Sequence, residues 1–201
     1  SRTLTTMLKL QDAKALSILS EATDRITEGE LLQIENGGQT TVNEALYLDL
    51  IGKKTASLLN ASCALGCLSV TADEASYERM KRFGENLGIA FQIKDDLLDY
   101  TGSRSKLGKP VGNDLREHKI TLPLIHALRQ AGDAEREQVL TWLAQSSLDE
   151  TATRRILSFV EARDGIGYAH QVATHYARQA EQELQPYADS ETKAGLMKLV
   201  D

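Results

Sequence analysis

Residues 91–100 read FQIKDDLLDY, a largely apolar run that carries three aspartates. In an α-helix, side chains three and four positions apart are neighbours. A helix over this run would therefore place four of its polar side chains on roughly one face; they are Gln92, Asp95, Asp96 and Asp99. Three carboxylates on one face repel each other, so we expect a cation to offset that repulsion.

Two interpretations of this acidic group are open. Charged side chains are mostly exposed, so a solvated acidic face is the ordinary outcome. The apolar residues around the aspartates instead predict a largely buried helix, in which charges must be paired or bind a metal. Lysines and glycines follow closely: Lys106, Lys109 and Lys119, with Gly102, Gly108 and Gly112 among them. Because Mg²⁺ is usually held by one or two carboxylates plus substrate phosphates, the combination favours a Mg²⁺-diphosphate site.

Composition excludes several classes of protein. A chain of 201 residues with 41% hydrophobic and 26% charged residues is typical of one or at most two globular domains. The net charge of -6, with no basic stretch to oppose it, argues against a nucleic-acid partner. No apolar run approaches the roughly 18 residues of a transmembrane segment, and no signal-peptide pattern opens the chain. We therefore expect a cytoplasmic protein.

Helical periodicity, only three prolines and the lack of a long alternating run predict an all-α protein. Asp12 is placed to cap a helix that runs to about Ile34, and Asn43 to cap a second. This second helix is expected to continue through Lys53-Lys54-Thr55 into a run of small residues, and a third to span about 73–100. Glycine is unfavourable inside a helix, so Gly84 and Gly88 indicate close packing or a nearby ligand.

The C-terminal half is expected to be helical as well. Asp114–Glu117 has the spacing of a capping box, and Thr121 can cap a helix that ends at Gly132. Residues 133–201 predict four short amphipathic helices. Cys63 and Cys67 lie four positions apart without further ligands nearby, so they are interpreted as packing residues. The histidines show no metal-binding spacing.

Five stretches, taken in order, resemble the trans-isoprenyl diphosphate synthases, and most of all their long-chain, octaprenyl-type polyprenyl branch. The stretches are Ile26–Gln33, Lys54–Ala56, Phe91–Tyr100, Leu107–Leu115 and Lys119–Pro123. Their order and spacing are family-like, which makes the resemblance more specific than a single acidic motif.

The resemblance implies a chemistry, a cofactor and a fold. The family joins an allylic diphosphate to isopentenyl diphosphate, with Mg²⁺ and lysines stabilising the departing diphosphate. An apolar cavity keeps water away from the carbocation. The implied fold is a single all-α domain of antiparallel helices around a central cavity, and the implied assembly is a homodimer.

The resemblance also implies site residues by position. Asp95 resembles a direct Mg²⁺ ligand, while Asp96 and Asp99 would hold metal-bound waters and orient the lysines. Lys54, Lys109 and Lys119 would donate to the allylic diphosphate. Thr55 and Gln92 would line its reacting end. Phe91 resembles an aromatic residue beside isopentenyl diphosphate, and Glu30 and Gln33 occupy a helical turn that faces the metals.

The chain departs from the family pattern in one respect. The family carries two aspartate-rich motifs, and the first of them, with the arginine pair after it, has no counterpart here. The N-terminal residues that hold isopentenyl diphosphate are also missing. We therefore expect residues 1–201 to be the C-terminal two-thirds of a polyprenyl synthase domain, insufficient for turnover alone.

Two other functions remain open. The chain could be a non-catalytic regulatory subunit of a heteromeric prenyl synthase, although such subunits tend to lose the aspartates that are kept here. It could also be a class I terpene cyclase, although cyclases do not usually carry Lys54-Thr55 or the lysines between 106 and 119. The residues encoded upstream of Ser1 would separate the three functions.

Overall fold

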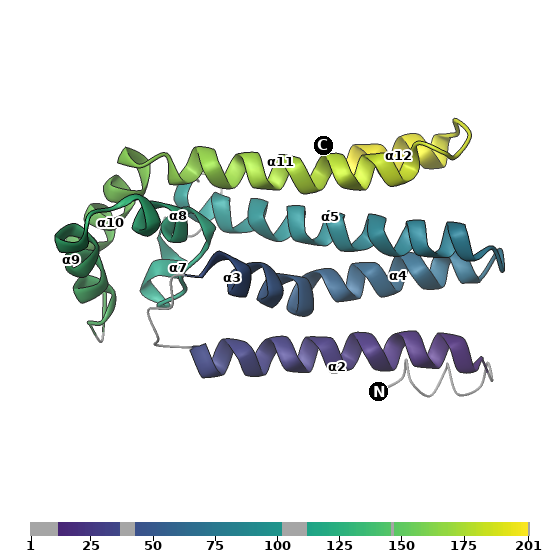
Figure 1. Ribbon diagram of the computed structural model, residues 1–201, viewed down its shortest axis with the longest axis horizontal. Coiled ribbons are helices and arrows are strands. Elements are labelled where there is room, and N and C mark those ends of the chain that lie inside the picture. The colour runs from purple at the N-terminus through teal and green to yellow at the C-terminus, as the bar shows by residue number, and fades with distance from the viewer. Residues whose placement is uncertain (1–11, 37–42, 102–111, 146, 201) are drawn as a thin grey trace. The chain divides into compact units, whose positions relative to one another are not determined.

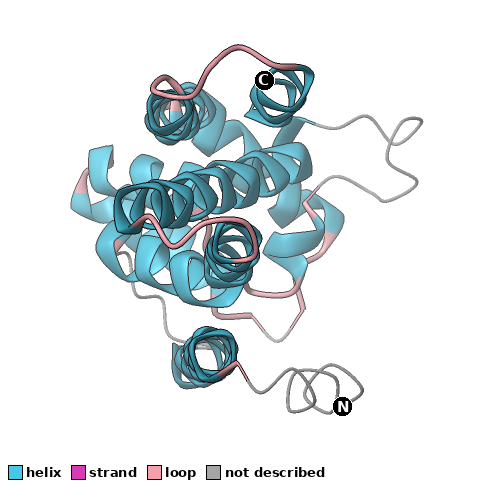
Figure 2. Ribbon diagram, turned by 90° about the vertical axis from the view of Figure 1, so that its right-hand side faces the viewer, coloured by secondary structure: helices cyan, strands magenta, loops and turns pink. Residues whose placement is uncertain are grey.

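The computed structural model describes residues 12–36, 43–101, 112–145 and 147–200. Its helices are α2 (Ala13–Asn36), α3 (Glu44–Ile51), the π-helical turn η1 (Gly52–Ala56), α4 (Ser57–Leu68), α5 (Glu74–Thr101), α7 (Asn113–Arg116), α8 (Leu122–Gln130), α9 (Asp133–Leu143), α10 (Glu150–Ala162), α11 (Gly165–Leu184) and α12 (Glu191–Val200) (Figure 1). These described ranges contain helices and loops and no strand (Figure 2). The predicted all-α class is confirmed.

Several helix starts follow from the local sequence. Asp12 accepts the backbone N–H of Ala15 through Oδ1 at 3.0 Å, and Asn43 accepts that of Ala45 at 2.9 Å. Each bond satisfies a donor that the first turn of a helix leaves without a partner. The predicted caps of α2 and α3 are therefore confirmed, and the four helices predicted after residue 132 correspond to α9–α12.

The chain divides into two compact units. The first consists of Ser1–Leu31, Leu50–Ala90 and His175–Asp201, and the second of Leu32–Asp49 and Phe91–Thr174. In the part that the structure describes, no helix is long and apolar enough to cross a membrane.

The first unit is held together by close helix packing. Ile18 and Ala22 of α2 lie against Ala61 and Ala64 of α4. A Cβ atom on Gly84 would lie 2.5 Å from the carbonyl oxygen of Leu59. Close packing is thus the reason for this glycine inside α5, as the sequence suggested, and Gly88 is in the same situation.

The second unit has one large apolar core. Its largest fully buried side chains come from α7, α8, α9 and α10: Leu115, Leu124, Leu128, Val139, Ile156 and Val160. Tyr100, at the end of α5, is also buried in this cluster. This core fixes the last turns of α5 against α7 and α8.

Two local predictions were wrong. The second predicted helix is not one regular helix, because the π-helical turn η1 separates α3 from α4 at Gly52–Ala56. The capping box at Asp114 does not form either: the residue before α7 is Gly112, with φ of 79°, and no side chain of its own caps the helix. A Cβ atom at this glycine would also lie 2.5 Å from Cγ2 of Thr153.

Candidate functional site

The C-terminal half of α5 is only partly buried. Ile89, Ile93 and Leu97, spaced four apart, face the interior, whereas Phe91 is 60% exposed. Asp95 is exposed, Asp96 is buried with 7% exposure, and Asp99 lies between these extremes. The three carboxylates therefore stand in three different environments.

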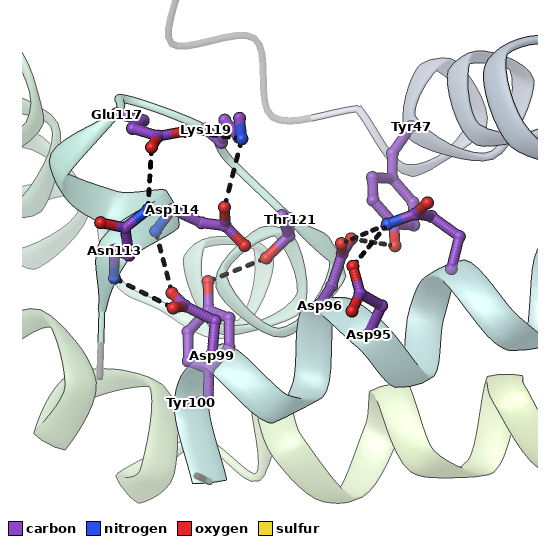
Figure 3. A network of polar contacts seen from close by, with 11 residues as sticks. Tyr47, Asp95, Asp96, Asp99, Tyr100, Asn113, Asp114, Glu117, Lys119 and Thr121 are labelled. Atoms are coloured by element: carbon purple, nitrogen blue, oxygen red, sulfur yellow. Dashed lines mark hydrogen bonds and ion pairs between the residues drawn. The ribbon is translucent and has the colours of Figure 1, made fainter. Parts of the chain in front are cut away.

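Asp96 has both carboxylate oxygens engaged by protein donors. The Tyr47 hydroxyl, from α3, donates to Oδ2 at 2.6 Å (Figure 3). Gln92 Nε2 donates to Oδ1 at 2.9 Å. Burial raises the pKa of Asp96 to about 6, and the two hydrogen bonds oppose that shift. Burial, together with the charge of Asp96, also raises the pKa of Tyr47.

Asp99 holds the beginning of α7. Its two carboxylate oxygens accept the backbone N–H groups of Asn113 and Asp114, each at 3.0 Å, and its carbonyl oxygen accepts that of Gly112 at 3.0 Å. Burial is the main cause that raises the pKa of Asp99. The residue thus closes the connection between α5 and α7.

Lys119 lies at the other end of α7 among acidic side chains. Its ammonium is 2.7 Å from Glu117 and 3.3 Å from Asp114 (Figure 3). The hydrogen bond to Glu117 and the charge of Asp114 raise the pKa of this lysine, so it is a fixed cation. Nearby, the buried hydroxyls of Tyr100 and Thr121 lie 3.0 Å apart.

A salt bridge supports the start of α3. Glu44 pairs with Arg129 of α8 and accepts a hydrogen bond from the Tyr168 hydroxyl of α11 at 2.6 Å. Tyr168 in turn stacks on His126, with ring centroids 4.0 Å apart. Because Tyr47 is one turn beyond Glu44, these contacts also place the Tyr47 side chain.

Three of the other predicted site residues lie in the first unit. Lys54 and Thr55 belong to η1, and Lys54 pairs with Glu30 of α2 at 3.0 Å. A Cβ atom on the intervening Gly29 would lie 3.0 Å from the backbone nitrogen of Lys54, so α2 reaches η1 closely because residue 29 is glycine. π-Helical turns are frequent at functional sites.

The predicted residues therefore fall into separate groups. Phe91, Gln92, the three aspartates and Lys119 belong to the second unit, as does Gln33, which lies on α2. The ion pair brings Lys54 and Glu30 together within the first unit. Lys109 lies outside the described residues.

The fit of a metal ion depends on Asp95. Among the described residues, no three histidine, cysteine, aspartate or glutamate side chains converge as a complete ligand set. Mg²⁺ does not need such a set when substrate phosphates complete its coordination. An exposed carboxylate such as that of Asp95 fits this mode of binding.

Tyr47 and Asp114 bind predicted site residues, although neither was itself predicted as part of the site. Tyr47 appears in the sequence as one more residue of an apolar helix. Its bond to Asp96 spans 49 residues, so no local spacing indicates it. The position of Asp114, five residues before Lys119, could have indicated this ion pair. From the sequence, Asp114 was instead interpreted as part of a capping box.

Known proteins match most of the chain. It is 32% identical over 199 residues to octaprenyl diphosphate synthase of Haemophilus influenzae, which covers 99% of this chain and 60% of the relative. It is also 32% identical to heptaprenyl diphosphate synthase component 2 of Geobacillus stearothermophilus, over 90% of this chain and 55% of the relative. The chain thus spans about three-fifths or less of these relatives' length.

A solved structure of a polyprenyl synthase also resembles this chain. The polyprenyl synthase of Caulobacter crescentus, complexed with calcium and isoprenyl diphosphate, superposes with a TM-score of 0.86 at 34% identity, covering 96% of this chain and 59% of that one. The sequence model of the polyprenyl synthetase family matches residues 1–160. The resemblance inferred from the motifs is therefore confirmed, and the chain belongs to the polyprenyl synthetase family.

Proposed function

We propose that this chain forms the diphosphate-binding part of a Mg²⁺-dependent prenyltransferase that condenses an allylic diphosphate with isopentenyl diphosphate. The product would be an all-trans polyprenyl diphosphate. Family membership supports the reaction class, and the Caulobacter structure supports the ligand class, since that protein is complexed with calcium and isoprenyl diphosphate.

The observation that carries the proposal is the unequal environment of the acidic residues on α5. Asp96 and Asp99 are held by protein donors, whereas Asp95 presents an exposed carboxylate. Asp95 would hold Mg²⁺, while Asp96 and Asp99 would act on metal-bound waters and on the lysines around them. When bound, Mg²⁺ supplies positive charge that stabilises the departing diphosphate.

The protein's own residues would bind and orient the diphosphate. In the second unit, Lys119 is a fixed cation and Gln92 lies beside Asp95. In the first unit, Lys54 and Thr55 are proposed as donors, with Glu30 holding the lysine. Lys109 and Gln33 complete the proposed set.

The proposed reaction is the one that membership of the family implies. The bond between the allylic carbon and the diphosphate oxygen breaks, the carbocation is attacked by the isopentenyl double bond, and a proton is lost to the released diphosphate. Fixed positive charges lower the barrier because they face the anion that forms as the first bond breaks. Phe91, which is 60% exposed, would cover isopentenyl diphosphate with an apolar surface.

The decisive experiment is Asp95→Ala in the full-length protein. We expect condensation of an allylic diphosphate with isopentenyl diphosphate to fall by several orders of magnitude, with unchanged helix content by circular dichroism. Asp133→Ala, which removes an exposed aspartate from α9, should keep nearly full activity. Near-normal turnover of the Asp95 variant would refute the metal assignment.

The assembly and the location are also proposals. A homodimer in the cytoplasm is expected, with residues 1–201 as the C-terminal two-thirds of the domain. The relative named as component 2 of heptaprenyl diphosphate synthase favours testing a heteromer as well. Light scattering on the purified full-length protein would show a dimer if the first assignment is right, and activity that needs a second gene product would support a heteromer.

A further inference from the structure

The two oxygens of the buried Asp96 carboxylate accept hydrogen bonds from two different helices, α3 and α5. Oδ2 receives the Tyr47 hydroxyl of α3 at 2.6 Å, and Oδ1 receives Nε2 of Gln92 at 2.9 Å. Both Tyr47 and Asp96 are buried, with 6% and 7% exposure. An ionised carboxylate only accepts hydrogen bonds, so this pair of donors is matched to it.

The arrangement fixes the orientation of the Gln92 side chain. A glutamine amide can present either its oxygen or its nitrogen, and an ionised Asp96 accepts only the nitrogen. The same nitrogen lies 3.4 Å from Oδ2 of Asp95. Gln92 therefore bridges the buried aspartate and the exposed one, and its bond to Asp96 holds the amide nitrogen beside Asp95.

The Tyr47 hydroxyl is itself held in place. The first turn of α3 is fixed to α8 and α11 through Glu44, which pairs with Arg129 and accepts the Tyr168 hydroxyl. Among the described residues, the side-chain donors to Asp96 are Tyr47, on Oδ2, and Gln92, on Oδ1. Without the Tyr47 hydroxyl, Oδ2 would be a buried acceptor without a partner, so the carboxylate would rotate or shift.

We propose that Tyr47 is a positioning residue for the diphosphate-transfer reaction: its hydroxyl holds the Asp96 carboxylate, which orients the Gln92 amide beside Asp95. Tyr47 acts through Asp96 and touches no substrate. The inference rests on the proposed function for its consequence in catalysis, but its geometric part concerns only Tyr47, Asp96 and Gln92.

A second buried tyrosine supplies the matched control. Tyr100 lies on α5, is 8% exposed, and pairs its hydroxyl with that of Thr121 at 3.0 Å. Tyr47→Phe and Tyr100→Phe each remove one buried hydroxyl from the second unit. A purely structural role would give the two variants similar losses of stability and similar catalytic effects.

The first test reads the Gln92 amide directly, without metal or substrate. In the full-length protein labelled with ¹⁵N, the side-chain amide signal of Gln92 is assigned through Gln92→Ala. We expect Tyr47→Phe to move this signal toward the position of an exposed glutamine, and Tyr100→Phe to leave it in place. An unmoved Gln92 signal in folded Tyr47→Phe would overturn the proposal.

The second test measures condensation by the full-length protein. Tyr47→Phe should lower kcat by about 10- to 100-fold, since a misplacement of about 1 Å can cost about 10²-fold. KM for the allylic diphosphate should change much less, and Tyr100→Phe should change kcat by less than about twofold. Equal kcat losses in the two variants would overturn the catalytic part.

Two further results remain informative. If the full-length wild type condenses no prenyl diphosphate, the proposed function fails, while the Gln92 signal still decides the geometric part. If Tyr47→Phe does not fold, Asp96→Asn replaces it, because the asparagine amide puts an N–H₂ donor in place of one of the two acceptor oxygens that Tyr47 and Gln92 use. A displaced Gln92 signal then supports the proposal, and an unchanged one overturns it.

Discussion

Asp99 accepts the backbone N–H of Asp114 through a carboxylate oxygen at 3.0 Å, across fifteen positions of the chain. A second bond, to the N–H of Asn113, uses its other oxygen. The start of α7 thus obtains from α5 the cap that its own sequence does not provide. An aspartate expected to act on metal-bound water therefore also holds the fold together.

Asp99→Ala should destabilise the protein. It removes two hydrogen bonds to a carboxylate at a helix start, and we expect the free energy of unfolding to fall by about 2 kcal/mol. Urea denaturation of the 201-residue chain measures the loss. Asp95→Ala is the control and should change the stability little, because Asp95 is exposed; equal losses would contradict the capping role.

Asp96 makes the stability depend on pH in a defined direction. Burial raises its pKa from 3.8 to about 6, so the folded state binds this proton more tightly than the unfolded chain. The contribution of Asp96 to stability is therefore largest below 3.8 and declines as the pH rises toward 6. At neutral pH the ionised carboxylate costs at most about 3 kcal/mol.

The measurement compares the wild type with Asp96→Asn, which does not titrate. The difference in unfolding free energy between the two should change between about pH 4 and about pH 6 and be constant above that range. A difference that stays constant through the whole range would show that Asp96 titrates normally. All samples are measured without added metal.

Local sequence predicted the elements, and long-range contacts determined the site. Asp12 and Asn43 could be identified as caps because their partners lie two or three residues away. The turn η1 could not be predicted, since a π-helical turn adds to a helical pattern without ending it. The partners of Asp96 and Asp99 could not be assigned either, because Tyr47 and Asp114 lie 49 and 15 positions away.

Two glycines inside helices should respond to alanine with opposite signs. In Gly88→Ala the new Cβ would lie 2.5 Å from Cα of Ala56, so α5 and η1 would have to separate, at a cost of about 1–3 kcal/mol. Gly66 on α4 has nothing within 4 Å of such an atom. Gly66→Ala should stabilise the protein by about 0.5–1 kcal/mol, because alanine favours the helix. Thermal unfolding of both variants checks the signs, and two changes of the same sign would contradict the packing seen here.

Lys54 and Lys53 provide the last comparison, between neighbouring lysines that each pair with a glutamate of α2. Lys54 lies 3.0 Å from Glu30, and Lys53 lies 3.6 Å from Glu28. Both pairs are partly exposed, so each lysine-to-alanine change should alter stability by less than about 1 kcal/mol.

If Lys54 binds the allylic diphosphate, Lys54→Ala should lower kcat/KM of the full-length protein by about 10- to 100-fold, because one charge-assisted hydrogen bond is lost. Lys53→Ala should leave kcat/KM within about twofold, since only Lys54 is assigned to the substrate. Steady-state kinetics at saturating Mg²⁺ decides the matter, because equal effects of the two changes would mean that the pair acts only through the positive charge of this surface.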